Sequence, residues 1–184
     1  MILPMYIFGQ PVLRKVAEDI EEDYPNLKEL IENMFETLRH SEGVGLAAPQ
    51  VGLAKRLFIV DLDCLSEDHP EFKGYLKTFI NPEIVEFGKE MGTYEEGCLS
   101  LPGIHENVKR PTKVLVNYLD ENFEEHEEWF DGFPARVIQH EYDHLDGKMF
   151  IDHLSALRKQ MLKSKLSAMA KGKFEAAYKC KANR

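Results

Sequence analysis

The residues best suited to chemistry form one short run, His140-Glu141-Tyr142-Asp143-His144. Residues four apart share one face of an α-helix, so the two imidazoles could point at the same metal ion. Glu141 is rotated by about 100° from His140, which would let its carboxylate reach a water molecule on that ion. The run therefore predicts a metal-assisted hydrolase site. The alternative is a pair of partly exposed helical histidines flanked by acids.

Two histidines are only part of a catalytic site, because such metal ions usually take three protein ligands. One peptidase class places a third histidine where this chain has Phe150, although Gly147 fits that class. Another class uses a downstream glutamate, and there is none between Phe150 and Phe174. His153 remains a candidate, but it lies beyond the expected helix end and is more typical of a surface loop.

An upstream segment, Glu95 to Gly103, offers a different third ligand. Cys98 follows Gly97, where the backbone can approach a bound group closely. A thiolate is a strong ligand for zinc or ferrous iron. Taken alone, a cysteine at this position would more often be a small buried side chain.

Three segments together resemble, in order and spacing, the signature motifs of the peptide deformylases. They are Gly43-Val44-Gly45-Leu46-Ala47-Ala48-Pro49-Gln50, Glu96-Gly97-Cys98-Leu99-Ser100 and Gln139-His140-Glu141-Tyr142-Asp143-His144. The resemblance covers nearly the whole chain and is closest to bacterial-type members. It implies one catalytic domain over residues 1–184 that removes the formyl group from the N-formylmethionine of newly made proteins and releases formate.

The resemblance implies that Cys98, His140 and His144 hold one divalent metal ion. Family members typically use Fe²⁺ and can accept Zn²⁺ or Ni²⁺, which suits a donor set with one thiolate. Such an ion would lower the pKa of its water from about 15.7 to about 7. Glu141 would take the proton from that water and later give it to the departing amine.

By the same resemblance, the Gln50 side-chain amide and the Leu99 backbone N–H stabilise the negative charge that grows on the formyl oxygen. The backbone at Val44, Gly45 and Gly97 is expected to pair with the extended substrate in the manner of a strand.

An apolar pocket for the methionine side chain is expected to draw on Val137 and on Tyr142 or Phe133. In many bacterial members the stretch after the cysteine motif contributes an arginine near the peptide, and this chain has Gly103-Ile104-His105 at that place. Contacts with the later residues of the substrate are therefore left open.

The glycine-rich segment also fits the G-x-G-x-x-A dinucleotide fingerprint, from Gly43 to Ala48. That fingerprint must follow a strand and open a helix. Here an amphipathic helix is expected before it, and Pro49 and Gly52 follow it. A dinucleotide site is excluded on these grounds.

Helices are expected to carry or flank the motifs. Apolar residues three and four apart predict a helix from Leu27 to Leu38 that ends by Gly43. A second helix is predicted from Pro134 to a stop at Asp146-Gly147, and it carries both histidines. A third, basic helix is expected over about 155–184, with Ser155 as its N-cap.

Branched and aromatic residues predict strands at 57–62, 79–87 and 113–119, followed by a hairpin turn at 120–122. The order of elements predicts an α+β fold. Mixed or antiparallel sheets would pack around a central metal-binding helix, with N-terminal and C-terminal helices beside them.

Composition is that of a soluble globular domain, with 43% apolar and 30% charged residues among 184. No apolar run approaches the roughly 20 residues of a membrane helix, and Met1 to Gln10 do not read as a signal peptide. Three cysteines, an odd number, suit a reducing cytoplasm. No role follows for Cys64 or Cys180.

Charge is distributed unevenly along the chain. The net charge of −9 argues against a general nucleic-acid binder, and no DNA or membrane partner is expected. From Arg158 to Arg184, however, there are nine Lys or Arg and one acid, Glu175. This +8 tail could bind ribosomal RNA through phosphate contacts, or it could simply be a solvated lysine-rich helix.

Two other function classes remain open at this point. A zinc endopeptidase using His140 and His144 with another third ligand would keep its metal in a Cys98→Ser variant and would cut internal peptide bonds. A non-catalytic ribosome-associated module would hold a structural metal in a closed site with four ligands.

Overall fold

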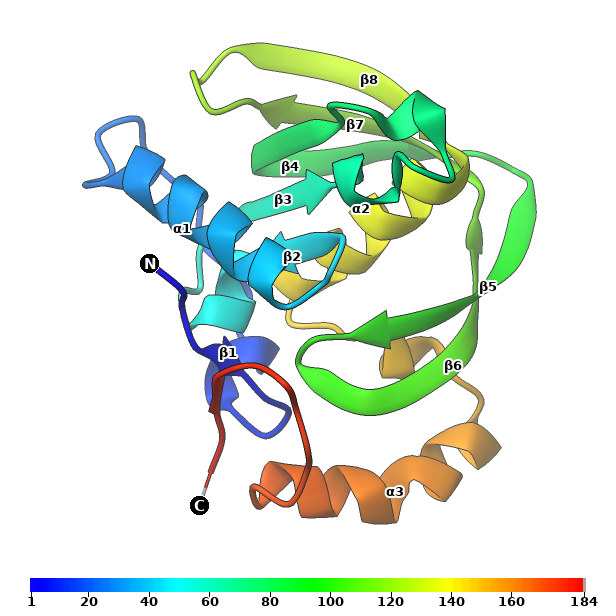
Figure 1. Ribbon diagram of the computed structural model, residues 1–184. Helices are drawn as coiled ribbons and strands as arrows, with labels where there is room; N and C mark the ends of the chain where they lie inside the picture. The colour runs from blue at the N-terminus through cyan, green and yellow to red at the C-terminus, as the bar shows by residue number, and fades with distance from the viewer. Residues whose placement is uncertain (184) are drawn as a thin grey trace.

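The structure, a computed structural model that describes residues 1–183, places one central helix between a five-stranded sheet and a separate hairpin (Figure 1). A second helix packs beside the sheet, and a third lies at the opposite end of the molecule, beyond the hairpin (Figure 1). The α+β fold predicted from the sequence is confirmed.

The five-stranded sheet is antiparallel throughout and has the order β2-β3-β4-β7-β8. Every residue of β3 is buried, which explains its unbroken apolar run, and Phe58 stacks on Phe79 of the next strand at 4.6 Å between ring centroids. The expected hairpin turn joins the last two strands. The bounds are β2 Gly45–Ala47, β3 Leu57–Asp61, β4 Leu76–Phe87, β7 Lys113–Leu119 and β8 Glu125–Asp131.

The separate hairpin consists of β5 (Met91–Cys98) and β6 (Leu101–Pro111), which the sequence patterns did not single out as strands. Gly97 pairs with His105, but the next residue, Cys98, pairs with Leu101. The register therefore shifts abruptly, and Leu99 and Ser100 form a tight turn at the end of β5.

The central helix, α2 (Gly132–Leu145), begins two residues before the predicted start. The Asp131 side chain accepts a hydrogen bond from the Gly132 amide at the N-cap, and this satisfies one of the free N–H groups of the first turn. The helix ends before Asp146-Gly147, as predicted, where Gly147 has a φ of 70° that favours glycine. Eight of its 14 residues are buried.

The first helix, α1 (Leu27–His40), matches the predicted range closely and buries Ile31, Met34 and Leu38. Short 3-10 helices connect the main elements; their bounds are η1 Pro11–Arg14, η2 Ala48–Val51, η3 Asp63–Leu65, η4 Pro70–Phe72 and η5 Phe150–His153. Among residues 1–183, no helix is both long enough and apolar enough to span a membrane.

The prediction of a basic helix over about 155–184 is wrong in its extent. Ser155 does cap α3, which spans Ala156–Ala170, but the helix ends before Gly172, whose φ of 79° suits glycine. The following residues turn back to β9 (Cys180–Lys181), which pairs in parallel with β1 (Met5–Tyr6). Arg184, the last residue of the basic tail, lies outside the described residues.

Apolar side chains of α3 reach the core only in the second half of the helix. Met169 is buried, and Leu162 and Leu166 pack against the core at its edge. Leu157 and Met161 remain 67% and 61% exposed. The helix therefore lies on the body at its C-terminal end and presents much of its surface to solvent.

Candidate metal centre

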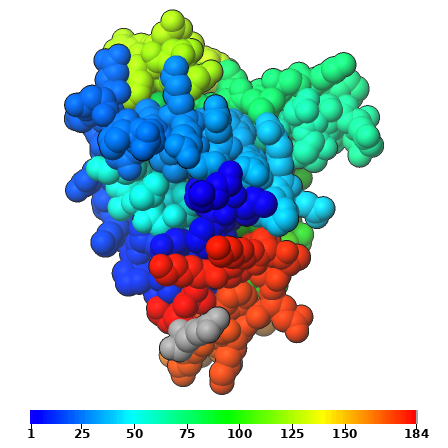
Figure 2. All heavy atoms as spheres, turned by 60° about the vertical axis from the view of Figure 1, so that its left-hand side comes forward, coloured from blue at the N-terminus to red at the C-terminus, as the bar shows by residue number. Residues whose placement is uncertain are grey.

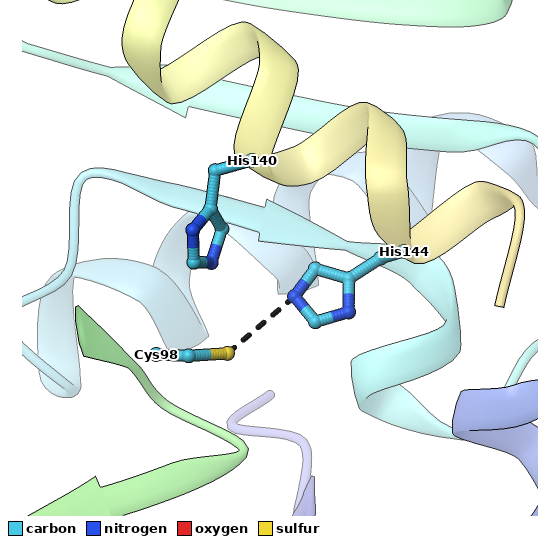
Figure 3. A group of neighbouring side chains, drawn as sticks. All are labelled: Cys98, His140 and His144. Atoms are coloured by element: carbon cyan, nitrogen blue, oxygen red, sulfur yellow. Dashed lines mark hydrogen bonds between the residues drawn. The ribbon is translucent and has the colours of Figure 1, made fainter. Parts of the chain in front are cut away.

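Three of the predicted side chains meet at one point. The Cys98 thiol and a ring nitrogen from each of His140 and His144 all lie within 4.8 Å of one another. The Cys98 Sγ atom is 3.4 Å from Nε2 of His144 (Figure 3). Both imidazoles project from the same face of α2, and the thiol approaches from the end of β5 (Figure 3).

A buried carboxylate orients the first histidine. Nδ1 of His140 is 2.8 Å from Oε1 of Glu96, so an imidazole that donates from Nδ1 leaves its Nε2 lone pair for a metal. Burial would raise the pKa of Glu96, but hydrogen bonds from His140 and Arg110 outweigh it and lower that pKa. Glu96 is therefore an anion at neutral pH.

Two arginines hold Glu96 in turn. Arg110 donates to both carboxylate oxygens at 2.7 and 3.0 Å, and Arg136 donates to Oε2 at 2.8 Å. Arg110 also donates to Asp143 at 2.9 Å, and Asp143 lies 2.7 Å from Nε2 of His153. His153, the alternative third ligand, thus belongs to this ion network and not to the cluster of ligands.

The two histidines have opposite electrostatic surroundings. Burial would lower the pKa of His140, but contacts with Cys98 and Glu96 raise it, so a positive charge is favoured between these two groups. Burial lowers the pKa of His144 to about 3, which keeps its ring neutral and able to ligate. Two imidazoles and one thiol are a donor set that zinc and ferrous iron accept.

Glu141 lies beside the cluster and is almost fully buried, at 4% exposure. Burial raises its pKa to about 7. Its Oε2 atom makes no hydrogen bond to any group within residues 1–183, which is costly unless water or a ligand supplies a partner. A Cβ atom at Gly45 would lie 2.7 Å from Glu141 Oε1, so glycine is needed there to make room for the carboxylate.

The side-chain amide of Gln50 contacts the Cys98 thiol. Its Nε2 atom donates to Cys98 Sγ at 3.4 Å and to Ser100 Oγ at 3.3 Å. Its Oε1 atom accepts the Ala47 backbone N–H at 2.9 Å, which fixes the amide with its NH₂ group toward the site. Gln50 is 1% exposed. The Gln50 NH₂ group is therefore a buried hydrogen-bond donor held next to Cys98.

A cleft of about 510 Å³ opens onto this group. Its walls include the predicted residues Val44, Gly45, Gly97 and Leu99, and the apolar pair Phe133 and Val137. Tyr142 does not line the cleft. Its ring faces the Arg56 guanidinium at 5.5 Å, so its expected place in a methionine pocket is wrong.

Comparison with known proteins decides the family. A family model described as polypeptide deformylase matches residues 2–160. A peptide deformylase of Christiangramia forsetii is 49% identical over 97% of this chain and 95% of its own. The crystal structure of peptide deformylase from Thermotoga maritima has a TM-score of 0.76 at 42% identity, covering 84% of this chain and 99% of that chain. A peptide deformylase structure from Legionella pneumophila has a TM-score of 0.80 at 38% identity, covering 91% and 94%.

The chain belongs to the peptide deformylase family. It is a metal-dependent hydrolase that removes the N-formyl group from newly made peptides. The resemblance seen in the three sequence motifs is thereby confirmed.

Sequence reasoning missed the residues that support the ligands of this deformylase. Glu96 and Asp143 stood inside the motifs, but no role was assigned to them. Arg110 and Arg136 lie outside every motif, and the only signal they gave was an arginine in an otherwise strand-like or helical run. Their partners are 14 to 40 residues away in the chain, which a local pattern does not reveal.

Proposed function

We propose that Cys98, His140 and His144 hold the metal ion of this deformylase, and that the physiological ion is Fe²⁺, with Zn²⁺ or Ni²⁺ as substitutes. The meeting of one thiol and two imidazoles beside a buried carboxylate oxygen without a described partner is the observation that carries the proposal. When bound, the ion supplies Lewis acidity and lowers the pKa of water to about 7.

Glu141 moves the proton. With a pKa of about 7, its carboxyl group can both accept and release a proton at neutral pH, which is the condition for a general base that later acts as an acid. It takes a proton from the attacking water and delivers it to the amine nitrogen as the C–N bond of the formamide breaks. Formate and a free amino terminus result.

Gln50 and Leu99 stabilise the negative charge that develops on the formyl oxygen. The Gln50 NH₂ group is already aimed at the thiol by the hydrogen bond that holds its carbonyl oxygen. The Leu99 N–H comes from the turn immediately after Cys98. A positioned donor of this kind is worth roughly 10²–10³ in rate.

The substrate peptide lies along the cleft. The backbone at Val44, Gly45 and Gly97 pairs with the extended chain, and Phe133 with Val137 forms the apolar wall for the methionine side chain. The Gly45 backbone is close to Glu141, so a peptide held there has its formamide near the proton acceptor.

Formate release from a formyl-Met-Ala-Ser peptide by anaerobically purified enzyme tests these roles, with Glu141→Ala as the comparison. Anaerobic handling protects a thiolate site from oxidation. We expect release by the wild type and almost none by Glu141→Ala. Cleavage of internal peptide bonds, or a Cys98→Ser variant that keeps its metal and activity, would favour a zinc endopeptidase site instead.

We further propose that the enzyme works in the cytoplasm at the ribosome, bound through its basic C-terminal region. A shallow polar groove on α3 and the residues after it is lined by Lys163, Lys171 and Lys173, and it shares no lining residue with the cleft. Lysines spaced in this way suit phosphate groups, and such binding weakens as salt rises.

Co-sedimentation with ribosomes tests the idea. The variant Lys163→Glu/Lys171→Glu should stay in the supernatant at a salt concentration at which the wild type pellets. Lys113→Glu, on the distant strand β7, is the matched control and should pellet normally. Equal pelleting of all three proteins contradicts ribosome binding by this groove.

A further inference from the structure

The turn that follows β5 carries two parts of the site on adjacent residues. Cys98 supplies the thiol, and Leu99 is the proposed backbone donor. The pairing of Cys98 with Leu101 closes a turn with Leu99 and Ser100 at its tip, which we call the ligand turn, residues 98–101. A small rotation of this turn would displace the thiol and the N–H together.

Both ends of the chain bind the ligand turn. The Phe8 backbone N–H donates to the Ser100 carbonyl at 2.9 Å. The Tyr178 hydroxyl donates to the Leu99 carbonyl at 2.7 Å. The two carbonyl groups at the tip of the turn are thus each held by a group from a segment that is distant in sequence.

These two segments are also joined to each other. β1 and β9 pair in parallel, with Met5 opposite Cys180, and the pairing extends through hydrogen bonds from the Met5 N–H to the Lys179 carbonyl and from the Ile7 N–H to the Lys181 carbonyl. Figure 2 shows the N-terminal strand and the C-terminal segment side by side on one face. Tyr178 is half-buried against the core. We call these two paired segments, residues 5–7 and 175–181, the brace. The brace holds the Tyr178 hydroxyl against the ligand turn.

The C-terminal part of the brace also borders the cleft. Glu175, Ala176 and Tyr178 line it beside Leu99 and Pro102. Burial raises the pKa of Tyr178, so its hydroxyl stays protonated and remains a donor. Glu175, Ala176 and Tyr178 follow the stretch, residues 2–160, that matches the family model. The C-terminal part of the brace therefore adds residues from outside that stretch to the wall of the cleft.

We propose that Tyr178 is a positioning residue for deformylation: its hydroxyl fixes the Leu99 carbonyl and thereby holds the ligand turn in the orientation that serves the reaction. The inference rests on the proposed role of the Leu99 N–H. It predicts that loss of one hydroxyl, distant from the metal ligands in sequence, lowers turnover without weakening substrate binding.

The variant Tyr178→Phe removes the hydroxyl and keeps the ring. We expect kcat to fall by about fivefold, the scale of one neutral hydrogen bond, with KM within about twofold of the wild type. Metal content per chain should be unchanged. Amide hydrogen exchange in residues 98–101 should become faster, because the turn has lost one of its two anchors.

Tyr118→Phe is the matched control. Its hydroxyl donates to Glu128 on the outer part of the five-stranded sheet, far along the sheet from β2 and the cleft. It should lower the melting temperature to a similar extent while leaving kcat and exchange in residues 98–101 unchanged. A general loss of stability would affect both variants alike, whereas positioning affects Tyr178→Phe alone.

Two results would overturn the inference: a Tyr178→Phe enzyme with wild-type kcat, or a fall in kcat without faster amide exchange in residues 98–101. Neither would disturb the proposed catalytic roles, which depend on formate release by the wild type and its loss in Glu141→Ala. Failure of those two measurements would refute the catalytic assignment itself, whatever Tyr178 does.

Discussion

Within residues 1–183, two places bring three potential metal ligands within 4.8 Å of one another, and they differ in almost every other respect. Cys98, His140 and His144 come from a strand end and a helix. Asp120, Glu124 and His126 all come from the hairpin between β7 and β8. Proximity of ligating atoms is therefore shared by the two groups and cannot by itself identify a metal centre.

The difference lies in what the ligating atoms already bind. Asp120 accepts hydrogen bonds from the backbone N–H groups of Asn122 and Glu124 and lies 2.7 Å from Nε2 of His126. The Asp120 carboxylate thus already has hydrogen-bond partners within its own turn. In the metal centre, Glu96 occupies one ring nitrogen of His140, and Glu141 Oε2 has no partner within the described chain. Buried polar atoms that need a partner, together with groups that aim the ligands, distinguish the site.

The largest effect is expected from Cys98→Ala, which removes one of the three proposed ligands. Bound metal should fall from one ion per chain to a small fraction, and formate release should drop by at least about 10⁴-fold, the upper range for loss of a general acid–base group. Metal analysis and a formate assay measure the two. His126→Ala, from the other group, should change neither. Metal loss in His126→Ala would contradict the prediction that only the group of Cys98, His140 and His144 binds metal.

Glu141→Gln is expected to come next. The amide keeps the size of the side chain but cannot accept the proton, so kcat should fall by about 10²- to 10⁴-fold. Metal content should stay at the wild-type level, because Glu141 is not proposed as a ligand. Measuring kcat beside metal content separates proton transfer from metal binding, and a parallel loss of both would make Glu141 a ligand.

Glu96→Gln tests the support behind His140. Loss of such a partner typically weakens metal affinity by about 10- to 100-fold. It also leaves Arg110 and Arg136 without their carboxylate, which should cost about 3–5 kcal/mol of folding free energy. A metal titration and denaturant unfolding measure these changes. Glu95→Gln, the exposed neighbour, should match the wild type in both; an equal loss there would remove the special role of Glu96.

The smallest expected effect is a pH-dependent change in folding stability from the hairpin of β7 and β8. Slight burial would raise the pKa of Asp120, but hydrogen bonds from His126, Asn122 and Glu124 lower it. Because the folded-state pKa is below the unfolded value of about 3.9, Asp120 stabilises the fold above that value, and the contribution is lost as pH falls through the folded pKa. Asp120→Asn should thus be slightly less stable than the wild type at pH 7, and this difference should shrink as pH falls below about 3.9. Denaturant midpoints over that pH range test this, and a difference in stability that does not shrink in acid would contradict it.

The sequence could predict that Cys98, His140 and His144 form one cluster, because each lies in a local motif. Two histidines four residues apart require only one helix, and the end of α2 was visible as Asp146-Gly147. The strands β5 and β6 were harder to predict because their buried positions include Glu96 and Arg110. A buried ion pair interrupts the apolar alternation by which a strand is recognised.

The C-terminal region was misjudged for a related reason. Lysines every few residues look like one continuous solvated helix, and the stop at Gly172 was not weighed against them. Phe174 and Tyr178 pack on the core from beyond that stop. Tyr178 donates to the Leu99 carbonyl, and the neighbouring strand β9 pairs with β1. Both contacts join segments that are far apart in the chain, so no local pattern of the sequence could predict them.

The parallel pairing of β1 with β9 has a consequence for the order in which parts of the active site are made during translation. Synthesis runs from the N-terminus, so Cys98, His140 and His144 all leave the ribosome before Tyr178 and before strand β9, which follows it. A nascent copy can thus bring its proposed ligands together before Tyr178 is available to hold the ligand turn.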